Sequence, residues 1–290
     1  MSHGYCPYTP VAAVRKAEDI LGPNREWRGS PGAQKAWLEA FYGPLYAEVL
    51  GIKEIVANAT FNPDAHVAWM KEQNWPTERP NLGDGEFVSA ACMDLLVHWA
   101  VPGYKRPLMA ADGKEYAAVA LGKDTIEIFE TSVGPVACLK TKTGDEVWLH
   151  MIDGVTAAGP ELAALAGMRF DRKWLKPSQS YDGIVFPMVD FTDKKSLDWL
   201  VGLSTVTQGG QPAKVLDAVQ RVELKMNHEG ARARAADEIR FGITSVRVPP
   251  PPLVIDRPFL AAFLRPGLAK PLFAAHLTQD AWKDPGGLGE

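Results

Sequence analysis

Acid–base chemistry is the first kind of chemistry that the residues of this chain suggest. Asp94 precedes His98 by four positions, and Trp99 follows that histidine directly. A carboxylate can hold an imidazole in one tautomer and let it act as a general base. The three side chains could share one pocket, because His150 ends another apolar stretch and could face the pocket that holds Asp94 and His98. Asp94, His98 and His150 are therefore the catalytic candidates, and a hydrogen-bonded core or surface position is the alternative for each.

Other reactive patterns are missing from the sequence. It contains no Gly-x-Ser-x-Gly elbow, no Walker loop, no Gly-x-Gly-x-x-Gly fingerprint and no His-x-x-x-His pair. The six histidines are scattered, and no cysteine and histidine have the spacing of a zinc site. We therefore expect neither a metal site nor a cofactor.

Composition and charge narrow the class of protein. The 290 residues are 46% hydrophobic and 23% charged, and they carry a net charge of −4. Such a chain can bury a large core, and its scattered basic residues favour neither nucleic acid nor an acidic membrane as a partner. No apolar run is long enough to span a membrane, and the first residues do not resemble a signal peptide. Cys6, Cys92 and Cys138 fit free, buried thiols, so a cytoplasmic location is expected.

Helix and strand patterns alternate along the first hundred residues. Within residues 31–50, Trp37, Phe41 and Leu45 recur at every fourth position, which predicts an amphipathic helix. The pair Gly43-Pro44 is expected to interrupt or bend it. Other predicted elements are a strand from Ile52 to Phe61, a short helix around His66–Met70 and an apolar stretch from Phe87 to Val101.

β-strands dominate from residue 115 onward. Strands at 116–121 and 125–129, separated by Gly122-Lys123-Asp124, predict one hairpin, and strands at 136–140 and 146–151 predict a second. Further predicted elements are a helix at 160–167, a strand at 181–191 interrupted by Pro187, a helical turn at 196–203, and strands at 219–226, 253–264 and 270–277. Runs of strands with scattered helices indicate an α+β protein with largely antiparallel sheets.

Four motifs near the carboxyl end follow one another in a distinctive order. They are Asn227-His228-Glu229-Gly230, the small-residue run 231–236, the four prolines 249–252 and Asp256-Arg257-Pro258-Phe259. This order resembles the carboxy-terminal end of serpins, where a strand leads into a small-residue hinge, an exposed reactive loop and a buried strand. The resemblance is nearly continuous from about Gly183 onward and includes Val185–Phe191. Thinner similarities lie upstream, at Val56–Phe61, Val88–Trp99 with Trp99 as the breach tryptophan, and Trp148–Met151.

The resemblance implies the serpin fold, an α+β architecture of large, mostly antiparallel sheets with packed helices and an exposed reactive loop. One serpin-like domain over residues 1–290 is expected, with the loop region at about 230–252. The chain is similar to a shortened, divergent, bacterial-like serpin. Helices near the amino terminus, and the helix that covers the main sheet, are expected to be shortened or absent.

Inhibition by a serpin requires the cleaved hinge to insert into the main sheet as a new strand, in which every second residue is buried. The resemblance assigns the hinge to Glu229, Gly230, Ala231, Ala233, Ala235 and Asp237. The alanines suit inward positions, and the intervening Arg232 and Arg234 would face outward. Asp237 is the next inward residue, and burial of an unpaired carboxylate is strongly unfavourable.

Two further positions depart from the serpin pattern. His228 stands where the end of the strand normally carries Glu, and Gln220 stands where the buried shutter histidine falls. Both departures, like Asp237, oppose a working hinge.

Arg247 and Val248 form the candidate scissile bond when positions are counted back from Pro258, which suits a trypsin-like serine protease. Counting forward from the hinge places that bond near Thr244 instead. A solvated arginine in a linker stiffened by proline is the alternative interpretation of Arg247.

Three functions remain open at this point. The resemblance implies a serine protease inhibitor that acts by reactive-loop insertion, and the hinge alanines favour it. The alternative is a non-inhibitory serpin-fold protein, either a binder of a small apolar ligand or an enzyme of a biosynthetic pathway that has reused the fold. Asp237 and Gln220 favour that alternative.

Overall fold

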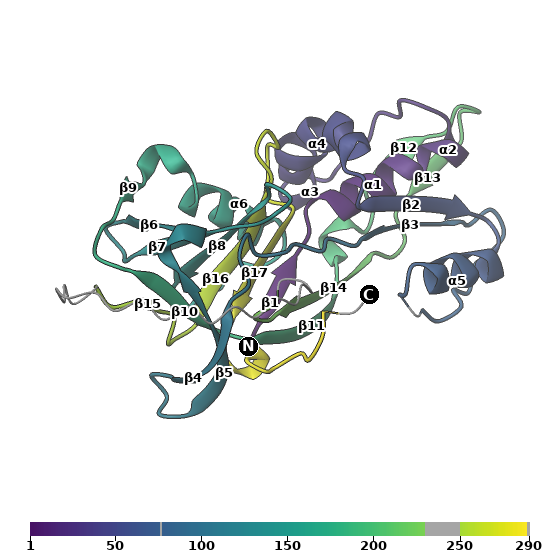
Figure 1. Ribbon diagram of the computed structural model, residues 1–290. Coiled ribbons are helices and arrows are strands. Elements are labelled where there is room, and N and C mark those ends of the chain that lie inside the picture. Colours follow the sequence, from purple (N-terminus) through teal and green to yellow (C-terminus); the bar gives the residue numbers. More distant parts are fainter. Residues whose placement is uncertain (76, 230–249, 289–290) are drawn as a thin grey trace, which may run out of the picture. The chain divides into compact units, whose positions relative to one another are not determined.

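A computed structural model describes residues 1–75, 77–229 and 250–288 of the protein (Figure 1). Contacts divide the chain into two compact units. The first unit comprises Met1–Tyr5, Leu96–Asp193 and Val222–Glu290, and the second comprises Cys6–Leu95 and Lys194–Arg221. Each unit is therefore built from segments that are distant in the sequence.

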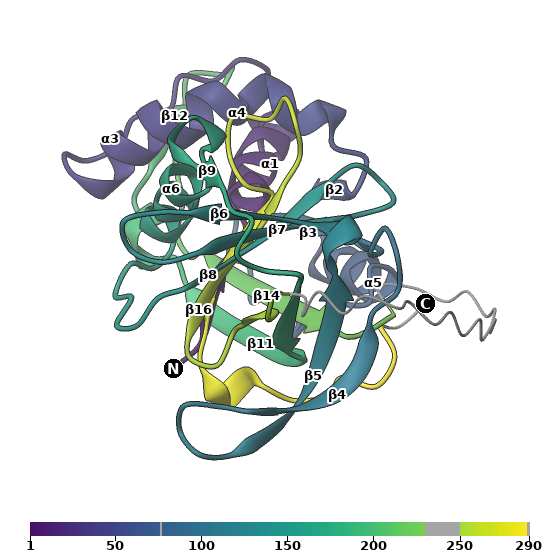
Figure 2. The same ribbon diagram turned by 60° about the vertical axis from the view of Figure 1, so that its left-hand side comes forward.

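A seven-stranded antiparallel sheet forms the core of the first unit (Figure 1 and Figure 2). Its strand order is β1-β17-β16-β8-β7-β6-β9. Its strands and the helix α6 that packs on it are β1 (His3–Tyr5), β6 (Ile126–Glu130), β7 (Val136–Lys140), β8 (Glu146–Met151), β9 (Lys176–Pro177), β16 (Phe259–Leu264), β17 (Phe273–Leu277) and α6 (Pro160–Arg169). The predicted hairpin of β7 and β8 is confirmed. Pairing of β1 with β17 joins the beginning of the chain to its end.

The two faces of this sheet pack against different elements. Trp148 of β8 contacts the ring of Phe170, the residue after α6, with 5.6 Å between ring centroids. Helix α6 therefore lies on the face that carries Trp148. On the opposite face, a Cβ at Gly4 would lie 3.1 Å from side-chain atoms of both Phe191 and Val222. A larger residue would push these side chains aside, so glycine suits this close approach.

A four-stranded sheet provides the other strands of the first unit. Its order is β15-β10-β5-β4, and only the β10–β15 pair is parallel. Its strands are β4 (Tyr104–Met109), β5 (Glu115–Gly122), β10 (Gly183–Pro187) and β15 (Leu253–Val254). Tyr104, Ala120, Val185 and Val254 lie in one row across it. One edge of this sheet is therefore β4, which begins directly after Gly103, and the other edge is β15.

The second unit combines helices with a small antiparallel ladder. Its elements include α1 (Tyr8–Lys16), α2 (Glu18–Leu21), α3 (Ala33–Trp37), α4 (Gly43–Glu48), α5 (Pro63–Glu72), β2 (Ile55–Thr60), β3 (Val88–Met93), β12 (Ser204–Val206) and β13 (Pro212–Lys214). Strands β2 and β3 pair with each other, and Ser89 of β3 donates its hydroxyl to the Ala13 carbonyl of α1 at 2.7 Å. Asn62 caps α5 by accepting hydrogen bonds from the backbone of Asp64 and Ala65. The strand and the helix predicted in this region are both confirmed.

One further two-stranded sheet has residues in both units. It consists of β11 (Val189–Ser196) and β14 (Val219–Met226). The bounds of β14 agree with the predicted strand at residues 219–226. β10 and β11 together account for the predicted strand at 181–191, with the break directly after Pro187.

The helix predicted over residues 31–50 is divided differently from the expectation. Helix α3 continues into a π-helical turn, Leu38–Tyr42, before α4 begins at Gly43. Pro44 lies in the first turn of α4, directly after the π-helical turn, and the backbone stays helical at Tyr42 and Gly43, where the two meet. Gly43-Pro44 therefore follows a local change in helix type and does not end the helical segment. The predicted apolar stripe is buried, at Trp37, Phe41 and Leu45.

The hairpin predicted at residues 116–129 is wrong. β5 pairs with β4 and β10, whereas β6 pairs with β7 and β9. A 3-10 turn at Lys123–Thr125 carries the chain from one sheet to the other. No strand was expected at Tyr104–Met109, because this edge strand contains Lys105, Arg106 and Pro107 and lacks hydrophobic alternation.

All three cysteines are free and buried, as predicted from their number and spacing. Burial raises the pKa of Cys6, Cys92 and Cys138, in the case of Cys92 to about 11. These thiols are therefore protonated at neutral pH and unreactive. In the described part of the chain, no helix is both long and apolar enough to cross a bilayer.

Candidate functional site

Strand β14 leads into the segment in which the hinge was predicted. Every second side chain along it is buried, namely Gln220, Val222, Leu224 and Met226. Between them, Lys225 and Glu223 form an ion pair with 2.7 Å between their charged atoms. This alternation is what a strand with one buried face requires.

Asn227 fixes the end of β14 through both its backbone and its side chain. The indole Nε1 of Trp99 donates to the Asn227 carbonyl at 2.9 Å, and both residues are buried. The side chain of Asn227 accepts from the Glu229 backbone at 2.9 Å and donates to the Gly286 carbonyl at 2.8 Å. Trp99, predicted as the breach tryptophan, thus lies at the base of segment 230–249.

Gly103 provides a second attachment for this strand end. Its backbone N–H donates to the His228 carbonyl at 2.8 Å. A Cβ at Gly103 would lie 2.5 Å from Val119 Cγ1 and 2.9 Å from the Ala120 carbonyl oxygen. The chain comes this close to β5 only because residue 103 is glycine.

The other end of segment 230–249 is fixed to the same four-stranded sheet. The Asp182 backbone donates to the Pro251 carbonyl at 3.3 Å, and β15 then pairs with β10. Val254 of β15 shares its row of the sheet with Tyr104, the neighbour of Gly103. The two fixed ends therefore lie at opposite edges of one sheet, about 14 Å apart at ordinary strand spacing. The intervening sequence could span about 65 Å when extended, several times this separation.

The side-chain amide of Gln220 forms three hydrogen bonds within the second unit. Its Nε2 donates to the Cys6 carbonyl at 2.8 Å and to the Thr9 hydroxyl at 2.9 Å, and its Oε1 accepts from the Cys6 backbone at 3.2 Å. The amide thus joins β14 to the beginning of α1. Gln220 was predicted to replace a buried histidine, and its burial at 8% exposure agrees with that position.

Three solved structures are similar to this chain over almost its whole length. Serpin48 of the insect Tenebrio molitor aligns with a TM-score of 0.53 and 12% identity, over 93% of this chain and 96% of that one. Native protease nexin-1, solved with heparin, aligns at 0.55 and 13%, over 93% and 96%. Thyroxine-binding globulin, solved with thyroxine, aligns at 0.57 and 11%, over 95% and 92%. The chain has the serpin fold.

The predicted α+β, serpin-like fold class is thereby confirmed. No protein-family model matches the chain, and no curated protein matches it in sequence. The identities of 11–13% show the serpin fold and leave the activity to be argued from residues. In this serpin fold, β14 and β15 flank the position of the predicted reactive loop.

Most of the predicted hinge lies outside the described residues. Glu229 is described, and its backbone donates to the Asn227 side chain. The predicted residues that lie outside are Gly230, Ala231, Ala233, Ala235, Asp237, Arg247 and Val248.

The three catalytic candidates lie in different surroundings. Asp94 belongs to the second unit, and His98 and His150 belong to the first. The His98 carbonyl accepts from Lys142, just past β7, whereas His150 pairs with Val136 at the other end of that strand. The two histidines are therefore separated by the length of β7.

Among the described residues, His150 has no hydrogen-bond partner of the kind that an acid–base site requires. It is 1% exposed, and neither ring nitrogen forms a well-aligned hydrogen bond within the described residues. Burial lowers its pKa, and the nearby Val133 backbone opposes that shift only in part. His150 is therefore a neutral core histidine at pH 7.

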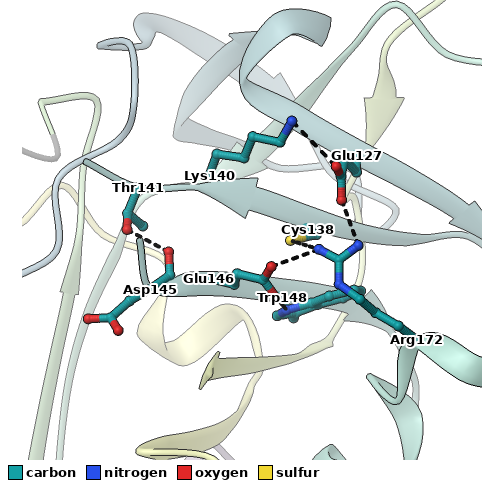
Figure 3. Close-up of polar contacts among 8 residues, drawn as sticks. All are labelled: Glu127, Cys138, Lys140, Thr141, Asp145, Glu146, Trp148 and Arg172. Carbon is teal, nitrogen blue, oxygen red and sulfur yellow. Dashed lines mark hydrogen bonds and ion pairs between the residues drawn. The ribbon is translucent and has the colours of Figure 1, made fainter. Parts of the chain in front are cut away.

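A polar network missed by the sequence analysis lies on the seven-stranded sheet (Figure 3). Arg172 donates to Glu127 at 2.8 Å and to Glu146 at 2.7 Å, and its guanidinium lies 5.0 Å from the centre of the Trp148 ring. The same guanidinium lies 3.6 Å from the Cys138 sulfur. Both carboxylates are already paired, so the network is an ion-pair cluster that holds Arg172 over the sheet. No group of three or more metal-ligating side chains occurs in the described ranges.

Proposed function

We propose that this chain is a serine protease inhibitor whose reactive loop, once cleaved, inserts beside β14. The proposal rests on the attachment of segment 230–249 at both ends, at His228 and at Val254, to opposite edges of one sheet. The connection is several times longer than the distance between its two attachment points. It can therefore extend away from the sheet and present a peptide bond to a protease. Cleavage would release one end and leave the other attached to β14.

The residues after Gly230 have the chemistry that an inserted strand needs at its beginning. Ala231, Ala233 and Ala235 are small and apolar at every second position, and the arginines between them would face outward. Insertion past Asp237 would bury a carboxylate. Insertion is therefore expected to be favourable through Ala235 and to be opposed at Asp237.

Arg247 is the residue that selects the target in this proposal. Trypsin-like proteases cleave after basic residues, and Arg247 precedes Val248 and four prolines. The proline run gives the carboxyl side of the loop an extended, preformed backbone. The proposed partner is therefore a trypsin-like serine protease.

Incubation with trypsin tests this function, because insertion traps the protease as a complex that resists SDS. We expect such a complex with the unaltered chain and none with Arg247→Ala. Arg257→Ala is the matched control, since Arg257 lies outside the loop and pairs with its neighbour Asp256. Ala233→Glu would place a carboxylate at an inward position and yield cleavage without complex. Cleavage of the unaltered chain after Arg247 without any complex would contradict the proposal.

One observation favours the alternative, a non-inhibitory serpin fold that holds a small apolar ligand or a substrate. The three hydrogen bonds of Gln220 join β14 to the beginning of α1, and they resist any movement of β14 that insertion requires. Cleavage at Arg247 with unchanged thermal stability is the result expected from that alternative.

A further inference from the structure

The carboxyl-terminal tail after β17 is fixed firmly to the first unit. The hydroxyl of Ser2 donates to an Asp280 carboxylate oxygen at 2.5 Å, and the Ser2 backbone donates to the other at 3.1 Å. Trp282 is 3% exposed and contacts the rings of Tyr116 and Phe259, with centroids 5.1 and 6.1 Å away. The chain beyond Trp282 therefore starts from a fixed point.

The next residues reach the base of segment 230–249. The Gly286 carbonyl accepts from the side chain of Asn227 at 2.8 Å, and Asn227 is 1% exposed. The Gly286 backbone donates to Asp284 at 2.9 Å, which fixes the turn that presents this carbonyl. A Gly-rich tail is often frayed, but here residues 284–286 make specific contacts.

The same turn also contacts β4. Lys105, which lies in β4 two residues after Gly103, forms an ion pair with Asp284 at 3.4 Å. Gly103 in turn donates to the carbonyl of His228, the neighbour of Asn227. The tail therefore bonds on both sides of the Gly103–His228 contact, to Asn227 on the β14 side and to Lys105 on the β4 side.

We propose that residues Asp284–Gly286 form a tail latch, which holds the end of β14 against Gly103 and so controls the release of the hinge. This inference deepens the proposed function, because the predicted hinge begins at Glu229, two residues after Asn227. An inserting strand must part β14 from its neighbours at this end first. The tail latch adds a part-buried hydrogen bond and an exposed ion pair that have to break in the same step.

Amide hydrogen exchange at Gly103 measures this opening without any protease. In a chain truncated after Lys283, we expect exchange at Gly103 to rise severalfold, up to about tenfold, as loss of one part-buried hydrogen bond implies. A chain truncated after Gly287 keeps the tail latch and serves as the matched control. The amide of Ile152, which donates to the Pro258 carbonyl, reports whether the first unit as a whole has been destabilised.

A second variant keeps the chain at full length. Asp284→Ala removes both the ion pair to Lys105 and the bond that orients Gly286, and we expect a severalfold rise in exchange at Gly103 with none at Ile152. Unchanged exchange at Gly103 in both variants would overturn the tail latch, as would an equal rise at both amides.

Assays of complex formation with trypsin distinguish a failure of the tail latch from a failure of the proposed function. If both hold, the chain truncated after Lys283 forms the trypsin complex faster than the control truncated after Gly287. If exchange at Gly103 rises but no variant forms a complex, the tail latch stands and the inhibitory function fails.

Discussion

The side-chain amide of Gln220 and the backbone of Cys6 are hydrogen-bonded in both directions, at 2.8 and 3.2 Å, although 214 positions separate them. Gln220→Leu would leave the Cys6 N–H and carbonyl and the Thr9 hydroxyl without these buried partners. We expect a loss of about 2–4 kcal/mol in the free energy of unfolding, measured by urea titration. The exposed neighbour Val219, changed to Ala, should lose less than about 0.5 kcal/mol. Equal losses for the two variants would mean that the hydrogen bonds of Gln220 contribute nothing to the free energy of unfolding.

Gly103 has no space for a side chain at the point where it contacts His228. Gly103→Ala would place Cβ within 2.5 Å of Val119 and should destabilise the protein by about 1–3 kcal/mol. Gly122→Ala is the matched control on β5, because nothing lies within 4 Å of its Cβ position. Thermal unfolding of both variants checks this, and a Gly103→Ala protein as stable as the control would refute the close approach.

Stability is expected to fall as the pH falls below about 6.5, because buried histidines, His150 and His276 among them, resist protonation. Burial lowers the pKa of His150 and of His276, whereas both titrate near 6.5 when the chain is unfolded. Above that pH the rings are neutral in both the folded and the unfolded state, so they do not make stability depend on pH. Below it the unfolded state binds protons that the folded state does not, so each histidine removes up to about 1.4 kcal/mol per pH unit.

His150→Leu should make the free energy of unfolding depend less steeply on pH between 6.5 and 5. Urea titrations of both proteins at several pH values measure this. An identical slope in the variant would show that His150 is protonated without cost in the folded state.

Arg172 contributes through packing as well as charge, because it lies over Trp148 and between two carboxylates. Arg172→Ala is expected to cost about 1 kcal/mol, a modest figure because the side chain is 47% exposed. Lys173→Ala, next to it, removes a more exposed pair with Asp171 and a contact with the exposed ring of Trp174, and should cost less than half as much. Urea titration at low and at 1 M salt distinguishes the two contributions, since salt screens the ion pairs and leaves the ring contact. A loss that vanishes entirely at high salt would contradict the packing contribution.

Local patterns predicted those elements whose neighbours are close in the sequence or whose burial alternates. β14 was predicted at its observed bounds because Val222, Leu224 and Met226 alternate with polar residues. β4 was missed because its exposed edge carries Lys105 and Arg106, so no alternation marks it.

The site was predicted less completely than the fold. Gln220 stood out as a departure from the serpin pattern, but nothing in its neighbourhood points to Cys6 as its partner. Gly103 and Gly286 act through backbone groups, which side-chain patterns do not reveal. The ion pairs of Arg172 join two separate strands to a turn, so only the folded chain brings them together.

The central claim is that cleavage of segment 230–249 lets its amino-terminal part insert beside β14. The most direct test is thermal unfolding of the protein before and after limited cleavage at Arg247. Insertion adds a hydrogen-bonded strand, and we predict a rise of about 10 °C or more in the melting temperature of the cleaved protein. An unchanged or lower melting temperature after complete cleavage would contradict the claim.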